Sequence, residues 1–298
     1  MTHLDQLEAE AIAIIREVVA ECARPVLLYS VGKDSAVLLH LAAKAFFPGK
    51  IPFPCLHIAS GWDFADLIAH RDREAARHGL DLVVHHEAAS AAAGIDPFAT
   101  PTPAYVEAML TAGLRNALDA GGWDAAFGGA RRDEEKARAK ERVLSFRSAD
   151  HRWDPRDQRP ELWQLFNTRK RRDETIRAFP LSNWTELDVW QYIAREAIPL
   201  VPLYFAAPRA VVERDGLTLV VDDPARFVAR AGERIEERWV RFRTLGCWPL
   251  TGASDSRAAT LDAVVAETLG ATASERQGRA VDREESASME RKKAQGYF

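Results

Sequence analysis

Cysteine is scarce in this sequence and never paired. The 298 residues contain three cysteines, Cys22, Cys55 and Cys247, and none of them lies in a C-x-x-C motif. Thiols scattered in this way argue against a disulfide framework and against a zinc site built on cysteine pairs. We therefore predict no metal site made by the protein alone and no covalent cross-link.

Long apolar runs and a strong net charge are also lacking. No apolar stretch approaches the length of a membrane span, and the residues after Met1 lack the basic and then apolar pattern of a signal peptide. The formal net charge of −4 gives no general attraction to nucleic acid or to a membrane surface. We expect a cytoplasmic protein that binds neither. With 47% hydrophobic residues, the chain can form one large domain with a smaller appendage.

The stretch over residues 25–35 holds the main functional signal. Residues 26–29 are a short apolar run typical of a buried parallel strand. Residues 35–44 place apolar side chains on one face and predict a helix. A strand, a glycine-containing loop and a helix in this order bring backbone N–H groups and the positive end of the helix dipole to one place. That place suits a pyrophosphate group.

The loop itself, residues 30–35, supplies phosphate-binding chemistry. Gly32 allows close approach of the backbone, and Lys33 adds a positive charge. Ser30 and Ser35 add hydroxyl groups. The spacing Ser-x-Gly-Lys-Asp-Ser is not the Walker motif, which needs G-x-x-x-x-G-K-[ST]. It resembles the PP-loop of ATP pyrophosphatases, which cleave ATP between the α- and β-phosphates. A capped strand-to-helix turn with a chance lysine is the alternative interpretation.

The N-terminal two thirds of the chain alternate between predicted helices and strands. Helices are expected over residues 4–22, 62–78 and 104–118, and further strands over 53–58, 80–85 and 123–127. This alternation predicts an α/β fold with a twisted parallel sheet flanked by helices. Ligands of such sheets lie at the carboxyl ends of the strands. The loops 30–35, 59–64 and 128–133 leave those ends and should face one cleft.

Residues 131–147 form the densest run of charge, with seven basic and four acidic side chains. A solvated helix with charge pairs is one interpretation. However, the run begins at the carboxyl end of a predicted strand, next to the predicted phosphate site. Arginine suits bidentate contacts with phosphate or sulfate. This position favours anion binding by Arg131 and Arg132.

Across its whole length the chain resembles the small, nucleotide-binding subunit of the bacterial heterodimeric sulfate adenylyltransferase, or ATP sulfurylase. The resemblance is carried by residues 29–35, 128–142, 151–163, 179–186, 240–252, 274–279 and 289–298. It implies the PP-loop fold of the phosphosulfate reductase-like superfamily, similar to the adenine nucleotide α-hydrolases. It also implies a nucleotide-binding domain over residues 1–207 and a C-terminal extension over 208–298 that contacts the partner.

The same resemblance implies a reaction. ATP and sulfate give adenosine 5′-phosphosulfate and pyrophosphate in sulfate assimilation and cysteine biosynthesis, and GTP hydrolysis by a large GTPase partner subunit drives the reaction. The chemistry needs alignment and charge stabilisation of two anions rather than a general base. Lys33 would hold the leaving pyrophosphate, and Arg131 and Arg132 would hold sulfate or the α-phosphate. Mg²⁺ is expected on the triphosphate, with Asp34 as an indirect ligand. The nucleotide-binding residues are expected to be Ser30, Gly32, Lys33, Asp34, Ser35, Ser60, Gly61 and Gly129.

Four positions depart from the pattern of that family. After the second strand the family usually reads Val-Asp-Thr-x-Trp-Lys-Phe, but Ala59 and Asp63 stand here in place of the acid and the lysine. Tyr105 and Leu110 stand where the family has a histidine and another lysine. The loss of two lysines favours an altered acceptor, another oxyanion or a carboxylate, or a weakly active subunit kept for partner binding. Neutral drift with compensation elsewhere is the other explanation.

Two related activities need cysteines that this chain does not have. A phosphosulfate reductase needs a nucleophilic cysteine near the C-terminus, and none follows Cys247. The tRNA thiolases need reactive cysteine pairs. Residues 274–298 are charged and poor in apolar side chains, which is typical of a tail that becomes ordered on a partner.

Overall fold

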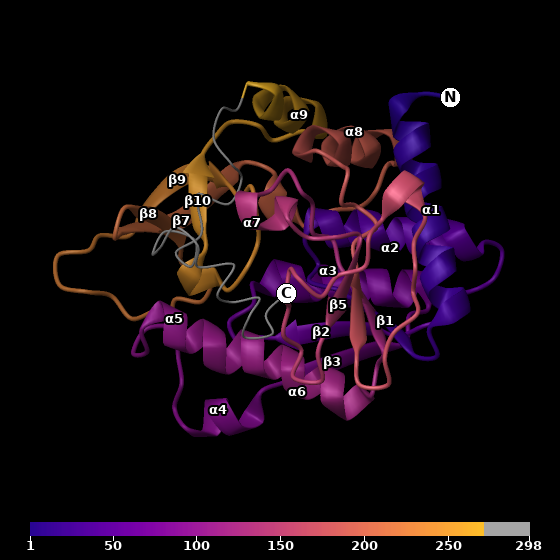
Figure 1. Cartoon of the computed structure of the whole chain (residues 1–298). Helices are drawn as coiled ribbons and strands as arrows, with labels where there is room; N and C mark the ends of the chain where they lie inside the picture. Colours follow the sequence, from indigo (N-terminus) through magenta and orange to yellow (C-terminus); the bar gives the residue numbers. More distant parts are fainter. Residues whose placement is uncertain (271–298) are drawn as a thin grey trace.

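The computed structural model of this chain describes residues 1–270, without the side chains of Lys136, Ala137 and Gln164. It shows a six-stranded sheet with helices on both faces and a four-stranded closed barrel beside it (Figure 1). The tail over residues 274–298, which we expect to bind a partner, lies outside the described residues. Within residues 1–270, no helix is both long and apolar enough to cross a bilayer.

The sheet has the strand order β3-β2-β1-β4-β6-β5. Its strands are β1 (Pro25–Leu28), β2 (Cys55–Ala59), β3 (Leu82–His86), β4 (Ala125–Phe127), β5 (Leu144–Arg147) and β6 (Thr175–Ala178). All neighbouring pairs are parallel except β5 and β6, which are antiparallel at one edge. The predicted parallel α/β sheet is confirmed. Because β2 and β4 lie on opposite sides of β1, the strand order reverses next to β1, where such sheets bind ligands.

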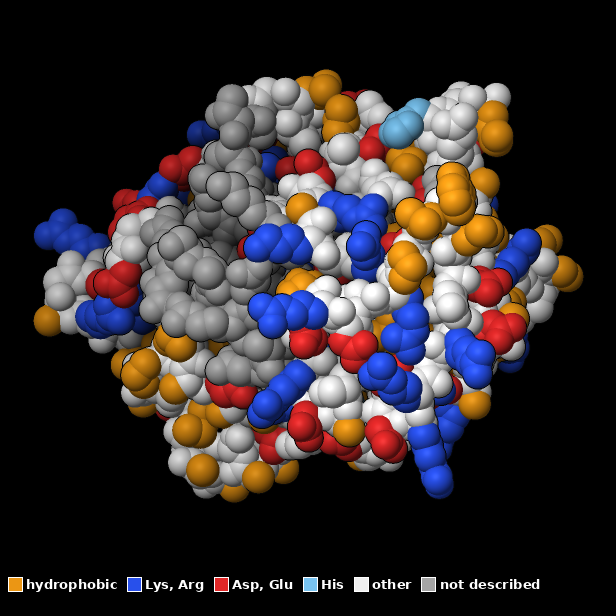
Figure 2. Space-filling view, viewed as in Figure 1, with side chains coloured by type: hydrophobic (Ala, Val, Ile, Leu, Met, Phe, Trp, Pro, Cys, Tyr) orange, Lys and Arg blue, Asp and Glu red, His pale blue; other side chains and the backbone are white. Residues whose placement is uncertain are grey.

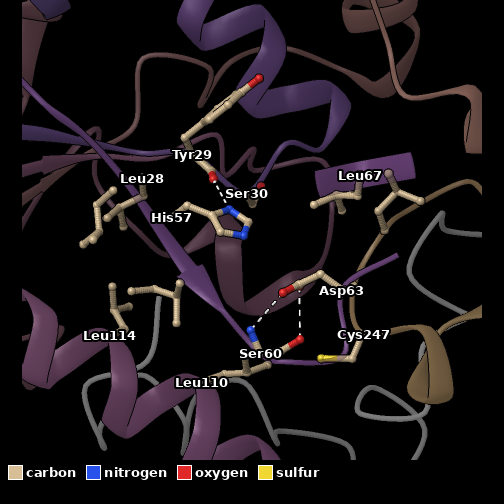
Figure 3. A pocket seen from close by; sticks show the side chains of 14 residues that line it. Leu28, Tyr29, Ser30, His57, Ser60, Asp63, Leu67, Leu110, Leu114 and Cys247 are labelled. Atoms are coloured by element: carbon tan, nitrogen blue, oxygen red, sulfur yellow. Dashed lines mark hydrogen bonds between the residues drawn. The ribbon is translucent and has the colours of Figure 1, made fainter. Parts of the chain in front are cut away.

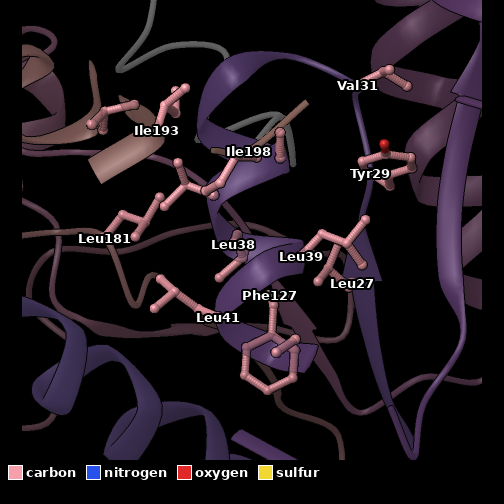
Figure 4. Close-up of a cluster of buried hydrophobic side chains, with 14 of the residues drawn as sticks. Leu27, Tyr29, Val31, Leu38, Leu39, Leu41, Phe127, Leu181, Ile193 and Ile198 are labelled. Carbon is pink, nitrogen blue, oxygen red and sulfur yellow. The ribbon is translucent and has the colours of Figure 1, made fainter. Parts of the chain in front are cut away.

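One face of the sheet carries the larger hydrophobic core. It is covered by α1 (His3–Glu21), α2 (Lys33–Phe46), α3 (Ala65–His78) and α8 (Glu186–Glu196). In this core Leu27 and Phe127 of the sheet pack with Leu38 and Leu41 of α2 and with Ile193 of α8 (Figure 4). The packing fixes the start of α2 at the end of β1.

The opposite face is covered by α6 (Ala112–Gly121), whose Leu114 and Leu118 pack against Val26 and Leu56. The helix expected over residues 104–118 is longer than predicted and irregular. It begins as α5 (Thr102–Tyr105), continues as a π-helical segment η1 (Val106–Thr111) and ends as α6. Such π segments are frequent at functional sites.

The charge run over residues 131–147 is not a solvated helix. It contains one short helix, α7 (Lys136–Ala139), and ends in the edge strand β5. Arg131, Arg138 and Arg147 are buried, and the guanidinium of Arg147 donates to the carboxylate of Glu141. The solvated-helix interpretation is wrong because most of the run is not helical and Arg131, Arg138 and Arg147 are buried near carboxylates instead of facing solvent.

The start of α8 is fixed by two reciprocal hydrogen bonds between Thr185 and Asp188. The Thr185 hydroxyl accepts from the backbone N–H of Asp188 at 3.1 Å, and the Asp188 carboxylate accepts from the backbone N–H of Thr185 at 2.8 Å. This is a capping box. The remaining short helices are α4 (Ala88–Ala92), η2 (Leu162–Gln164), η3 (Pro202–Tyr204) and η4 (Trp248–Leu250).

The C-terminal part forms an antiparallel barrel in the order β10-β8-β7-β9. Its strands are β7 (Ala207–Arg214), β8 (Leu217–Val220), β9 (Glu236–Arg241) and β10 (Gly252–Asp255), and they are followed by α9 (Leu261–Leu269), which contacts α8. Val211 and Val240 of the barrel belong to the same hydrophobic cluster as Leu27 of the sheet. The barrel is therefore packed onto the α/β layers by a continuous core.

Candidate functional site

The loop between β1 and α2 has a strained backbone. Val31 has a φ of 64°, a left-handed conformation that β-branched residues rarely adopt, and its side chain is buried in the core. With Gly32 as N-cap, α2 begins at Lys33, two residues before its predicted start. The Ser35 hydroxyl donates to the Gly32 carbonyl at 2.9 Å. The Lys33 N–H donates to the Tyr204 hydroxyl at 2.8 Å, so η3 also positions this loop.

A carboxylate between two cations lies at the start of α2. The Asp34 carboxylate is 3.1 Å from Nζ of Lys33 and 2.7 Å from Nε of Arg131. Burial alone would raise the pKa of Asp34, but the charges of Lys33 and Arg131 outweigh burial and lower it to about 2. Arg131 is also 3.8 Å from the carboxylate of Asp133. Lys33 and Arg131 thus bring two cations to the start of α2, where an anionic ligand could interact with them.

Gly129 allows the loop after β4 to approach the first turn of α2. A Cβ atom at Gly129 would lie 3.0 Å from Cβ of Asp34 and 3.3 Å from the backbone N of Ser35. Any larger residue would push the two loops apart. The structure thus brings Gly129 and Arg131 to the PP-loop, as the sequence predicts.

Arg132 lies in a different environment from Arg131. Its Nη1 donates to the side-chain oxygen of Asn183 at 2.5 Å, and its Nη2 is 3.8 Å from the carboxylate of Glu161. These partners come from the segments that surround the edge strand β5. Arg132 therefore contacts residues beside β5. Its role in holding sulfate stays a prediction.

Asp63 and Tyr105, two of the four positions that depart from the family pattern, organise the loop after β2. The Asp63 carboxylate accepts from the N–H and the hydroxyl of Ser60, both at 3.1 Å. The Tyr105 hydroxyl donates to the Ser60 carbonyl at 3.2 Å. Gly61 has a φ of 75°, which favours glycine. Asp63 and Tyr105 therefore hold the shape of the loop that carries the predicted nucleotide-binding residues Ser60 and Gly61.

The C-terminal barrel supports the same loop from outside. The Asp222 carboxylate accepts from the backbone N–H of Ala65 at 2.9 Å, at the start of α3. The Arg226 guanidinium lies over the Trp62 ring, 3.7 Å from its centroid, and donates to the Gly61 carbonyl at 2.9 Å. The loop between β2 and α3 is thus fixed by residues from both parts of the chain.

A cavity of about 190 Å³ opens between these loops (Figure 3). Its apolar walls come from β1, β2, α3, the π segment and α6, and its outer wall comes from residues 245–247, far along the chain. The apolar lining comprises Leu28, Leu56, Ile58, Leu67, Leu110, Leu114 and Leu245. The polar lining includes Ser30, His57, Ser60 and Asp63. Of the four departing positions, Asp63 and Leu110 line this cavity, while Ala59 lines a second hollow on the far side of Ser60.

Several residues of the site were not predicted from the sequence. His57 lies in the middle of β2 and lines the cavity, and Tyr204 contacts the PP-loop from η3. A histidine inside the apolar run Cys-Leu-His-Ile-Ala is a sequence signal that could have identified His57. No local pattern indicated Tyr204, because its contact is formed only by the tertiary fold.

The described residues contain no group of three or more His, Cys, Asp or Glu side chains that could hold a metal ion. Mg²⁺ commonly binds through one or two carboxylates together with substrate phosphates. Asp34 is the carboxylate at the PP-loop, and it is already paired with Lys33 and Arg131. Among the described residues, Asp34 is therefore the candidate carboxylate for a Mg²⁺ ion that arrives on a phosphate ligand.

Comparison with known proteins identifies one family model and relatives that match along the whole chain. Residues 24–253 match the phosphoadenosine phosphosulfate reductase domain. The sulfate adenylyltransferase subunit 2 of Caulobacter vibrioides is 62% identical over 298 residues, which cover 100% of this chain and 96% of that protein. The protein of the same name from Geobacter metallireducens is 60% identical, with 100% and 99% covered. Among solved structures, Candida glabrata FMN adenylyltransferase has a TM-score of 0.49 at 15% identity, with 93% of this chain and 87% of that chain covered.

Proposed function

Because this chain belongs to the sulfate adenylyltransferase subunit 2 family, we infer that it transfers AMP from ATP to sulfate, giving adenosine 5′-phosphosulfate and pyrophosphate. It is an ATP-dependent nucleotidyltransferase of sulfate activation. The observation that carries this function is the identity of about 60% over the full length of the relatives. The geometry described above supplies the roles of individual residues.

We propose that the leaving pyrophosphate binds at the start of α2. The helix dipole and the ammonium group of Lys33 stabilise the charge that develops when the bond between the α-phosphorus and its bridging oxygen breaks. Sulfate at neutral pH is already an anionic nucleophile, so one of its oxygens attacks the α-phosphorus without a general base. Arg131, 2.7 Å from Asp34, lies close enough to this loop to stabilise the α-phosphate or the sulfate. Gly129 sets the distance between the two loops.

We propose that the adenine ring occupies the cavity beside the PP-loop. Ser30 belongs both to the cavity wall and to the PP-loop, so a base in the cavity is continuous with phosphates on α2. Apolar walls with a few polar groups are typical of such binding sites. Mg²⁺ would be bound by the phosphates of ATP near Asp34 and would neutralise their charge.

The contacts of Asp63 and Tyr105 explain two of the departures from the family pattern without a change of acceptor. Both side chains are engaged in positioning Ser60, which gives them a structural reason to differ from the usual family pattern. The altered acceptor that the loss of two lysines favoured is therefore the weaker candidate. We place the reaction in the cytoplasm, where ATP is supplied.

The test of this function is sulfate-dependent pyrophosphate release from ATP by the purified chain together with its partner subunit. We expect release that saturates with sulfate and a stoichiometric yield of adenosine 5′-phosphosulfate, identified by mass. Parallel reactions contain another oxyanion or a carboxylate in place of sulfate. Release with one of these acceptors and none with sulfate would contradict the assignment.

We propose that the partner is a large GTPase subunit and that it binds beside the edge strand β5. The name of the relatives, subunit 2, implies a partner. Trp163 is 86% exposed and has a φ of 55°, so a strained backbone holds an apolar ring at the surface, with exposed Leu162 and Leu165 beside it. Arg152 and Arg156 are exposed in the same loop region, and Figure 2 shows basic and hydrophobic side chains together on this face. An apolar pocket with an acidic rim would complement it.

Co-purification with the partner tests this surface. Trp163→Asp should lower the amount of partner retained, whereas Val228→Asp, which changes an exposed apolar residue of the barrel, should not. Equal retention by both variants would contradict the proposed surface.

A chain ending at Ala273 should still bind ATP but lose the partner. Retention by the shortened chain would show that residues 274–298 are not needed for association.

A further inference from the structure

His57 presents a hydrogen-bond acceptor to the cavity. Its side chain is 3% exposed, and its Nδ1 lies 2.9 Å from the backbone carbonyl oxygen of Tyr29. A carbonyl oxygen can only accept, so Nδ1 carries the hydrogen, and in the neutral ring Nε2 then has a lone pair. Within the described part of the chain, Nε2 has no hydrogen-bond partner. A buried acceptor without a partner destabilises the protein, so this atom is suited to a ligand that donates.

The surroundings keep the ring neutral. Burial lowers the pKa of His57 below its usual range, and the charges of Arg71 and His86 act in the same direction. The hydrogen bond to Tyr29 and the charge of Asp63 oppose this change but do not outweigh it. At neutral pH the Nε2 atom is therefore an acceptor and not a donor.

The other polar side chains of the cavity wall differ from His57. The Ser60 hydroxyl donates to Asp63 at 3.1 Å and accepts from the Trp62 N–H at 3.0 Å. The Ser60 hydroxyl therefore already has a hydrogen-bond acceptor and a donor within the protein, so it constrains the choice of a bound base less than His57 does. Among the described side chains of this wall, His57 Nε2 is the buried acceptor without any hydrogen-bond partner, whereas each oxygen of the Asp63 carboxylate already accepts one hydrogen bond from Ser60. A base that donates to Nε2 is therefore favoured over a base that presents an acceptor to it.

We propose that His57 selects adenine as the base of the nucleotide by accepting a hydrogen bond from its exocyclic amine. Adenine has an N6 amino donor, whereas guanine and hypoxanthine have an O6 acceptor at the same position. Two acceptors facing each other in an apolar cavity would leave both without partners. This inference rests on the proposed function, because it requires the base to occupy the cavity.

The experiment measures equilibrium dissociation constants of the full-length chain by calorimetry for ATP, ITP and purine riboside triphosphate, which lacks a group at C6. We expect the unchanged chain to bind ATP about 10- to 100-fold more tightly than the other two. In His57→Phe the three constants should agree within about threefold. Because a ratio of constants does not depend on the folded fraction, partial unfolding cannot produce this result.

Two further variants distinguish a wrong role for His57 from a wrong location for the base. His70 is also a buried histidine, at 3% exposure in α3, and does not line the cavity, so His70→Phe should keep the preference for ATP. Leu114→Trp fills the cavity and should abolish nucleotide binding. Unchanged preference in His57→Phe, with binding lost in Leu114→Trp, would overturn the role of His57 while leaving the base in the cavity. Unchanged nucleotide binding in Leu114→Trp would overturn both the location of the base and the role of His57. If His70→Phe lost the preference for ATP as fully as His57→Phe, the loss would be due to altered packing and not to the His57 acceptor.

Discussion

Replacing Asp34 by Asn should make the stability of this protein less dependent on pH in acid. Asp34 lies between Lys33 and Arg131, and its pKa of about 2 is below the ordinary value of 3.8. Since the folded carboxyl binds a proton more weakly than the unfolded one, ionised Asp34 stabilises the folded chain. This contribution is complete above the unfolded pKa and is lost as the pH falls through it toward the folded pKa.

The magnitude follows from the two pKa values. A tenfold difference in proton affinity corresponds to about 1.4 kcal/mol, so the ionised carboxylate contributes about 2 kcal/mol near neutral pH. The Asp34 side chain is 21% exposed, so solvent screening reduces this value only in part. The difference in unfolding free energy between the unchanged chain and Asp34→Asn should decrease by about 1 kcal/mol between pH 6 and pH 3.

Urea unfolding followed by tryptophan fluorescence at closely spaced pH values measures this difference. The comparison is repeated in a Lys33→Met background, where one of the two cations beside Asp34 is gone and the decrease should be smaller. A difference that stays constant from pH 6 to pH 3 would refute the idea that the two cations keep Asp34 ionised. An equal decrease in both backgrounds would show that Lys33 contributes nothing to it.

The remaining predictions concern turnover and ligand affinity. Lys33→Ala should lower kcat per folded molecule by about 10²- to 10³-fold, because a cation facing the leaving group is lost; near-normal pyrophosphate release would contradict this role. Gly129→Ala should destabilise the chain by about 1–3 kcal/mol and weaken ATP binding, because its Cβ meets the backbone at the start of α2. In Gly113→Ala the nearest atoms are at ordinary contact distance, so both quantities should change little, and equal effects would refute the steric explanation. Asp63→Asn can keep hydrogen bonds to Ser60 while removing a charge, so it should lower the sulfate KM by about five- to thirtyfold without changing the ATP KM. An unchanged sulfate KM would show that the anion does not pass Asp63.

The sequence was sufficient to predict the order of strands and helices around the nucleotide site. The apolar run before Ser30 and the amphipathic pattern after Ser35 are local signals, and they correspond to β1 and α2. The boundaries differ by a few residues because Gly32 caps α2 earlier than its apolar face begins. The approach of Gly129 to α2 follows from the rule that ligand loops gather at the carboxyl ends of parallel strands.

Other features depend on contacts between distant segments and could not be read from local patterns. The burial of Arg131 and Arg147 depends on the carboxylates of Asp34 and Glu141, so the charge run alone could not exclude a solvated helix as an alternative to anion binding. Likewise, Tyr204 reaches the Lys33 N–H across more than half of the chain. The short barrel strands β9 and β10 lack a continuous apolar alternation, so no local pattern indicated them.

The cavity is assembled from both ends of the described chain, and this has a consequence for synthesis on the ribosome. A nascent chain that has completed β1, β2 and α6 still lacks the wall formed by residues 245–247. At roughly 5–20 residues per second, that wall follows Ser30 by an interval on the order of ten seconds or more. During this interval the apolar lining, such as Leu28 and Leu114, is incompletely covered and available to chaperones. With ATP in this cavity, as proposed, the nucleotide would be enclosed only after the barrel has emerged and would stabilise finished molecules and not truncated ones.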